Sequence, residues 1–172
     1  WRKLEEHFGT DSEYLGFLRD SPSAAQRLCH ILSNSRFLGD ALNKSVESVT
    51  WLGSDNDLQP RSRESLDVQT HASLERNAGS INDFANSIRA MRRHEIERIG
   101  LGWMSGVIDD KASLAGMTDV YDAAIDASLT WAIRHQTQEM GLDEAPAAIA
   151  VIGMGRYGGR EVNFSSDADV II

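Results

Sequence analysis

The stretch AIAVIGMGRYGGREVNFSSDADVII, residues 148–172, decides the fold class predicted for this chain. Its first apolar run, residues 149–154, predicts a buried strand. A loop rich in glycine follows, and the polar turn at residues 163–166 leads into a second apolar run at residues 170–172. Two strands joined by a loop therefore follow a chain whose earlier apolar pattern is helical. We predict an α+β fold that is mostly α.

Two aspartates, Asp167 and Asp169, stand at positions i and i+2 before the second apolar run. Because side chains alternate between the two faces of a strand, we expect both carboxylates on the same side. Mg²⁺ binds such carboxylates and fills its octahedral shell with water and phosphate oxygens. The glycines offer backbone N–H groups free of Cβ crowding, which suit a phosphate. The stretch therefore predicts a metal-dependent enzyme that acts on a nucleoside triphosphate.

Other interpretations of the glycines fit less well. Gly153-x-Gly155-x-x-Gly158 matches the dinucleotide fingerprint in its letters, but that fingerprint requires a helical crossover of about a dozen residues or more. Only eight residues separate Gly158 from Asp167. A P-loop is excluded because no Gly-Lys-Ser/Thr follows the glycines. A plain turn between two strands leaves unexplained why two like charges stand side by side before an apolar strand.

Composition and charge narrow the class of protein. A net charge of −9 over 172 residues argues against a general nucleic-acid binder. The single cysteine, Cys29, excludes an internal disulfide, fits a reducing cytoplasm and is expected to be a small buried residue. The chain has no apolar run near the ~18 residues that would span a bilayer, so we expect no membrane association. Because it begins at Trp1 without methionine and stops inside a predicted strand, we expect a fragment of a longer protein.

The remaining sequence predicts a long helical region before the strands. Residues 53–80 are rich in polar side chains, so we expect a solvated connector with at most one weak helix between Ser62 and Asn77. The predicted domains are a helical region at 1–52, the polar connector at 53–80, a helical approach at 81–145 and the start of a further domain at 146–172.

Two helices are predicted within residues 81–145. The first begins after Ser80 and is expected to break at residues 100–103, where two glycines occur. The second runs to about Met140 and is the longest in the chain. We expect its apolar stripe to form the packed face; the stripe consists of Leu114, Met117, Tyr121, Ile125, Leu129 and Ala132 or Ile133.

A basic cluster lies on the first of these helices. Arg89, Arg92, Arg93 and Arg98 fall within ten residues of an otherwise acidic chain. An ordinary solvated helix face accounts for such a cluster. The alternative is a binding site for a triphosphate or an acidic partner, and the sequence leaves both interpretations open.

The glycine loop and the aspartates together resemble a known family. Tyr157-Gly158-Gly159, a seven-residue spacer and Asp167-Ala168-Asp169 resemble the nucleotidyltransferase pattern. The whole run from Gly153 to Asp169 resembles the signature of bifunctional glutamine synthetase adenylyltransferase/adenylyl-removing enzymes, with Val162 in place of leucine. Looser agreement at residues 89–100 and 145–152 extends the resemblance over most of the chain. It implies a helical region followed by the first two strands of a truncated, polymerase-beta-like nucleotidyltransferase sheet.

The resemblance also implies an activity and a set of site residues. Such enzymes transfer AMP from ATP to a tyrosine of glutamine synthetase, and this chain is most similar to the C-terminal, adenylylating half. Asp167 and Asp169 would be catalytic and hold Mg²⁺. The nucleotide would be bound by Gly155, Arg156, Gly158, Gly159 and Ser166. The family's third carboxylate is expected beyond Ile172, so we expect residues 1–172 alone to be inactive.

Two alternative functions stay open. The same kind of site removes AMP by phosphorolysis in the other half of such enzymes, and Asn163 favours that half because asparagine is frequent there. Alternatively, the helices form chiefly a docking module for glutamine synthetase or a PII-type nitrogen signal protein. The upstream helices favour adenylylation over removal.

Overall fold

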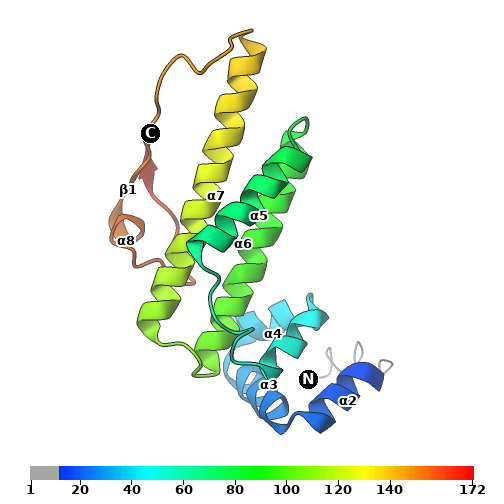
Figure 1. The fold of residues 1–172 in the computed structure, drawn as a ribbon. Helices are drawn as coiled ribbons and strands as arrows, with labels where there is room; N and C mark the ends of the chain where they lie inside the picture. The colour runs from blue at the N-terminus through cyan, green and yellow to red at the C-terminus, as the bar shows by residue number, and fades with distance from the viewer. Residues whose placement is uncertain (1–11) are drawn as a thin grey trace. The chain divides into compact units, whose positions relative to one another are not determined.

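The structure is a computed structural model of the chain and describes residues 12–172. Helices account for most of the described residues, and two short strands form an antiparallel pair, which confirms the predicted mostly-α α+β class (Figure 1). The first eleven residues of the predicted helical region 1–52 lie outside the described residues. The elements are α2 (Ser12–Asp20), α3 (Pro22–Asn34), α4 (Arg36–Leu42), the 3₁₀ helix η1 (Val46–Gly53), α5 (Arg63–Arg76), α6 (Ile81–Met104), α7 (Asp110–Glu139), β1 (Ile152–Gly153), α8 (Gly155–Gly158) and β2 (Val170–Ile171).

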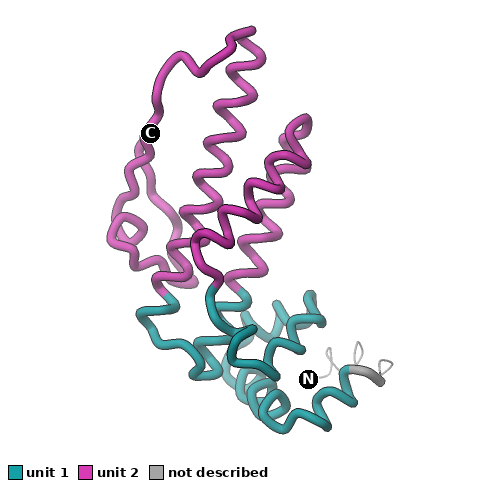
Figure 2. The backbone as a smooth tube through the Cα atoms, in the orientation of Figure 1, with its two compact units in different colours: residues 1–60, 97–113 teal, residues 61–96, 114–172 magenta. Residues whose placement is uncertain are grey.

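The chain divides into two compact units (Figure 2). Unit 1 contains residues 1–60 and Glu97–Ser113, and unit 2 contains Arg61–Ile96 and Leu114–Ile172. The long helices α6 and α7 therefore each contribute residues to both units. The domain boundaries predicted after residues 52, 80 and 145 stay predictions.

Unit 1 has its own apolar core, built mainly from α3, α4 and η1. Arg98 of α6 is buried here: its guanidinium carbon lies 4.1 Å from the centroid of the Trp51 ring, and it donates to the carbonyl of Asp57. This member of the basic cluster is therefore part of the packing. Cys29 is exposed on α3, so the prediction that it is buried is wrong. The buried core residues are Ala24, Leu28, Ile31, Leu38, Leu42, Val49, Leu52, Leu58 and Leu101.

Helix α6 continues through the break predicted at residues 100–103 and ends at Met104. Gly102 lies inside the helix, where it allows close packing against another backbone segment. A Cβ atom at this position would lie 2.3 Å from the carbonyl oxygen of Leu58. Because only glycine permits such close approach of two backbones, the residue that suggested a helix break instead allows a tight contact within unit 1.

Helix α5, with Ser62 and Asn77 as its caps, lies where the sequence predicts one weak helix in the polar connector, and one of its faces is packed. Its side chains Leu66, Thr70, Ser73 and Leu74 are buried. These positions follow helical spacing, but half of them are polar, so the sequence lacks a clear apolar stripe. The Ser73 hydroxyl satisfies its hydrogen bonding by donating to the hydroxyl of Ser87 on α6, at 2.6 Å. A partly buried polar pair stands here in place of an apolar contact, which the periodicity would have revealed.

The packed face of α7 is shifted from the predicted apolar stripe. Met117 is buried as predicted, but Tyr121, Ile125 and Leu129 are only half-buried. The buried face instead contains Val120, Ala123, Ala124, Ala127 and Trp131. Small alanine side chains permit close packing of α7, which leaves the larger apolar side chains at its border. None of the described helices combines the length and apolar character that a bilayer crossing requires.

The two strands are short and exposed. Ile152 pairs with Ile171, and Gly153 pairs with Val170, in antiparallel register. The first predicted strand, residues 149–154, is therefore reduced to two residues, and Ile152 is 58% exposed. The prediction of a buried strand is wrong here, since a two-stranded pair supplies no facing layer to cover its apolar side chains.

Candidate functional site

The glycine loop forms a tight turn that joins β1 to the single-turn helix α8. Gly155 has φ of +52°, in the left-handed region that favours glycine. Gly158 lies against the backbone of Gly153: a Cβ atom on Gly158 would lie 2.3 Å from the Gly153 carbonyl oxygen. Gly159 is less constrained, because its nearest neighbour would be 3.4 Å away. Close approach of two backbone segments therefore explains Gly158, and the left-handed backbone conformation explains Gly155.

Strand pairing brings Asp169 to this loop. The Met154 amide donates to the Asp169 carbonyl at 2.8 Å, directly beyond the ladder formed by β1 and β2. The Asp169 carboxylate oxygen Oδ2 lies 3.9 Å from the position that a Cβ atom on Gly155 would occupy. The structure thus brings together Asp169 and Gly155, two residues that the sequence assigned to one site.

Asp167 and Ser166 lie in the turn that precedes β2. The Ser166 hydroxyl lies 3.0 Å from the side-chain oxygen of Asn163, and the Asn163 amide donates to the same hydroxyl at 3.2 Å. The Tyr121 hydroxyl of α7 donates to the Ser166 carbonyl at 3.3 Å. Ser166 therefore stabilises the turn. Asp167, the next residue, is exposed.

Both aspartates suit a hard divalent cation. Asp167 and Asp169 are exposed, and within residues 12–172 neither has an ion-pair partner. Two carboxylates of one site repel each other when they lie close, and a cation would relieve that repulsion. Oxygen ligands match Mg²⁺, which keeps several waters when bound to proteins. Among residues 12–172, no group of three or more histidine, cysteine, aspartate or glutamate side chains is arranged to hold a metal ion.

Helix α8 is fixed to α7 by polar contacts that the sequence alone did not reveal. Tyr157 is buried, and its hydroxyl donates to Asp122 Oδ1 at 2.6 Å. Burial and the hydrogen bond to Asp122 raise the pKa of Tyr157 well above its usual range, so the phenol stays a donor. Arg160, just after α8, lies 3.2 Å from Asp122 and 2.5 Å from Asp119. The hydrogen bond to Asp119 raises the pKa of Arg160.

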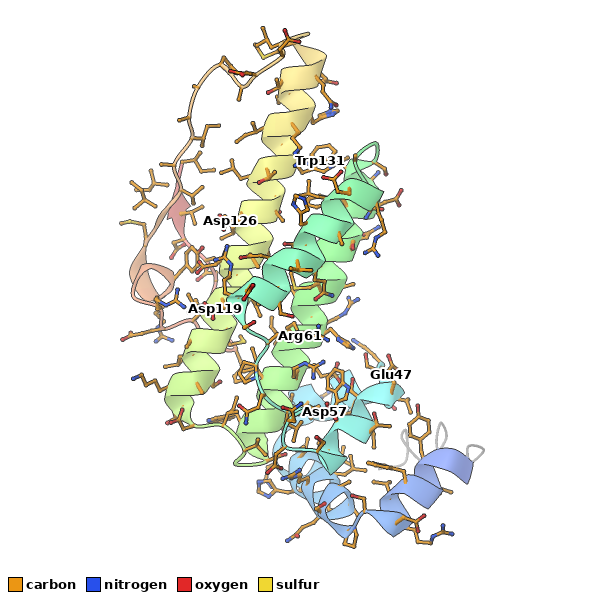
Figure 3. The ribbon with its side chains drawn as sticks, viewed as in Figure 1. Glu47, Asp57, Arg61, Asp119, Asp126 and Trp131 are labelled. Carbon is orange, nitrogen blue, oxygen red and sulfur yellow. The ribbon has the colours of Figure 1, made fainter. Side chains whose placement is uncertain are left out.

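Arg63 of α5 also contacts the aspartates of α7. Arg63 Nη1 lies 3.4 Å from Asp122 Oδ2, and Arg63 also contacts Asp67 and Asp126. Asp119 and Asp126 are labelled along α7 in Figure 3. The spacing of Asp119, Asp122 and Asp126, at i, i+3 and i+7, is the signal that places three carboxylates on one face of α7. Their partners lie far away in sequence, so the spacing alone does not reveal them.

A cavity of about 830 Å³ in unit 2 is lined in part by Asp167. Its walls come from α6, α7 and the C-terminal segment, and they are mainly apolar. Tyr121, Ile125 and Leu129, the half-buried side chains of the predicted α7 stripe, form part of the lining. Asp167 and Ser166 contribute polar groups to the same cavity.

Arg156 and Gly159 are exposed at α8 and the residue after it, beside the loop. The structure thus places Gly155, Arg156, Gly158 and Gly159 in a single turn. Asp169 lies against that turn, whereas Asp167 and Ser166 line the cavity. The assignment of all these residues to nucleotide or metal binding stays a prediction.

Comparison with known proteins identifies the family to which this chain belongs. The family model for glutamate–ammonia ligase adenylyltransferase, GlnE, matches residues 25–172. The chain belongs to this adenylyltransferase family, which confirms the resemblance predicted from the glycine loop and the aspartates.

Individual relatives are bifunctional glutamine synthetase adenylyltransferase/adenylyl-removing enzymes. The protein from Bifidobacterium longum (strain DJO10A) is 76% identical over 172 residues, which cover 100% of this chain and 16% of that protein. The protein from Leifsonia xyli subsp. xyli is 39% identical over 171 residues, which cover 99% of this chain and 16% of that protein. The protein from Mycobacterium tuberculosis (strain CDC 1551 / Oshkosh) is 36% identical over 174 residues, which cover 99% of this chain and 17% of that protein. The chain thus spans about a sixth of the length of these relatives.

Proposed function

We propose that this chain supplies part of a Mg²⁺-dependent site that transfers AMP from ATP to a tyrosine of glutamine synthetase, and so regulates nitrogen assimilation in the cytoplasm. The observation that carries the proposal is the pairing of β1 with β2, which holds the Asp169 carboxylate against the glycine turn at Gly155. Family membership and the names of the relatives support adenylyl transfer as the reaction.

The roles of the residues follow from their chemistry. Asp167 and Asp169 would hold the metal, and a bound Mg²⁺ would supply charge stabilisation at the reacting phosphate. The glycine turn would let phosphate oxygens approach the backbone closely, and Arg156 would add positive charge beside it. The Tyr157 and Arg160 contacts to α7 would keep this turn in one position, so that the α-phosphorus is aimed at the acceptor hydroxyl.

Phosphorolytic removal of AMP is the second candidate, and Asn163 favours it. The Asn163 side chain accepts hydrogen bonds from the Ser165 amide and from both serine hydroxyls of its turn, so it shapes the approach to Asp167. Removal uses inorganic phosphate as the attacking group at the same kind of site. The docking alternative, with glutamine synthetase or a PII-type protein as partner, predicts instead that the helices bind without contributing to chemistry.

The direction of the reaction is tested in a full-length protein that carries this sequence. Glutamine synthetase is incubated with radiolabelled ATP, and adenylylated synthetase is incubated separately with phosphate. Both assays compare the unaltered protein with Asp167→Asn. We expect the variant to lose label transfer from ATP and to keep phosphate-dependent release. Loss of release alone would assign the site to removal, and loss of neither would contradict a catalytic role for this stretch.

A further inference from the structure

Two arginines of the basic cluster share the cavity with Asp167. Arg89 and Arg92 are three residues apart on α6, so they lie on one face of that helix. Both line the cavity of about 830 Å³, to which Ser166 and Asp167 also contribute. The guanidinium carbon of Arg92 lies 5.6 Å from the centroid of the Tyr121 ring, another residue of the cavity wall.

These two arginines differ from others in unit 2 because no carboxylate neutralises them. Within residues 12–172, neither Arg89 nor Arg92 forms an ion pair with aspartate or glutamate, whereas Arg63 and Arg160 are bound by the aspartates of α7. Arg89 donates only a long hydrogen bond, 3.4 Å, to the side-chain oxygen of Asn86. The cavity therefore has two arginine charges available for an anionic ligand.

The other members of the cluster serve as contrasts. Arg98 is buried in unit 1 against Trp51 and belongs to the packing. Arg93 follows Arg92 directly but does not line the cavity, and it is exposed. The basic cluster is therefore not one uniform surface: Arg89 and Arg92 are the members that line the cavity together with Asp167.

We propose that Arg89 and Arg92 bind phosphate groups of the substrate in this cavity. The inference rests on the proposed function and adds two binding residues from a helix outside the glycine and aspartate stretch. A triphosphate with one bound Mg²⁺ remains negatively charged, and guanidinium groups form paired, charge-assisted hydrogen bonds with phosphate oxygens. The phosphate belongs to ATP if the site transfers AMP, and it is inorganic phosphate if the site removes AMP.

The test uses a full-length protein with Arg89→Gln, with Arg92→Gln and with both changes. Glutamine keeps a long polar side chain that suits an exposed helix position, so α6 is expected to stay folded. AMP transfer is measured against ATP concentration, and AMP release is measured against phosphate concentration. We expect the KM for the phosphate-bearing substrate to rise about tenfold for each arginine, with a smaller change in kcat. Arg93→Gln removes the same charge from the same helix and is expected to leave both KM values unchanged.

Each outcome separates the possibilities. A rise confined to ATP identifies the triphosphate as the ligand, and a rise confined to phosphate identifies the phosphorolytic substrate. Unchanged KM values in the double variant, or an equal effect in Arg93→Gln, would overturn the inference. Asp169→Asn is measured alongside: if it abolishes turnover while the arginine variants behave normally, only this inference fails. If Asp169→Asn retains turnover, the proposed function fails as well.

Discussion

Gly158 is the residue whose replacement should disturb the glycine turn most. A Cβ atom there would lie 2.3 Å from the Gly153 carbonyl oxygen, so alanine forces the two backbone segments apart. We expect Gly158→Ala in a full-length protein to reduce AMP transfer about a hundredfold, because small displacements of positioning groups have large kinetic effects. The matched control is Gly159→Ala, whose added carbon meets its nearest neighbour at 3.4 Å and whose φ of −79° suits alanine. Equal activity in the two variants would contradict the close-packed turn.

Tyr157 should hold the turn to α7 through its hydroxyl. Tyr157→Phe removes the 2.6 Å hydrogen bond to Asp122 and leaves the ring in place. A hydrogen bond to a charged partner contributes about 1.5–3 kcal/mol, so we expect amide hydrogen exchange in residues 154–162 to become at least about tenfold faster. Tyr121→Phe is the control, since its hydroxyl makes only a 3.3 Å bond to the Ser166 carbonyl. No change in exchange for Tyr157→Phe would show that the hydroxyl does not anchor α8.

The residues of the candidate site stand close together in the sequence, but the residues that hold them in position do not. Asp167, Asp169 and the glycines stand within one short stretch, so their spacing alone suggests metal and phosphate binding. Tyr157 and Asp122 are 35 residues apart, and no local pattern links them. Contacts that hold a site in position depend on how α7 packs, which the periodicity of its side chains predicts only roughly.

Helix α6 contains a glycine, Gly102, whose replacement should loosen the packing of unit 1. Gly102→Ala would place Cβ 2.3 Å from the Leu58 carbonyl oxygen, and overpacking of this kind costs about 1–3 kcal/mol. We expect faster amide exchange at residues 97–104, which belong to unit 1. Gly16→Ala in α2 is the opposite case, because no heavy atom lies within 4 Å of the added Cβ and alanine favours a helix by about 0.5–1 kcal/mol. Slower exchange in Gly102→Ala would contradict the packing described for this glycine.

The helices show where periodicity succeeds and where it fails. The sequence locates α7 because apolar residues recur along it, yet its buried face is built largely from alanines and is offset from the larger apolar side chains. It also locates α5 between Ser62 and Asn77, but it does not reveal that the polar side chains of Thr70 and Ser73 are buried. Whether a small or polar residue is buried depends on the neighbouring elements. The pattern of residues within one helix therefore cannot predict it.

For the whole molecule, activity should depend on a divalent cation. Asp167 and Asp169 are exposed and lack ion-pair partners among the described residues, so both carboxylates are available to bind a metal. Chelation with EDTA should abolish AMP transfer by a full-length protein, and added Mg²⁺ should restore it. Ca²⁺, which prefers a larger and less regular shell, is expected to restore much less. Full activity after chelation would contradict the metal-dependent account.

The most direct measurement of the central claim is AMP transfer by Asp169→Asn in a full-length protein that carries this sequence. Asp169 lies against the glycine turn through the Met154 hydrogen bond and its contact near Gly155. Asparagine keeps its size and removes its charge. We predict loss of radiolabelled AMP transfer with unchanged amide exchange in α7, while Asp143→Asn, an exposed aspartate before β1, leaves transfer intact. Near-normal turnover in Asp169→Asn would remove this carboxylate from the reaction and contradict the proposed site.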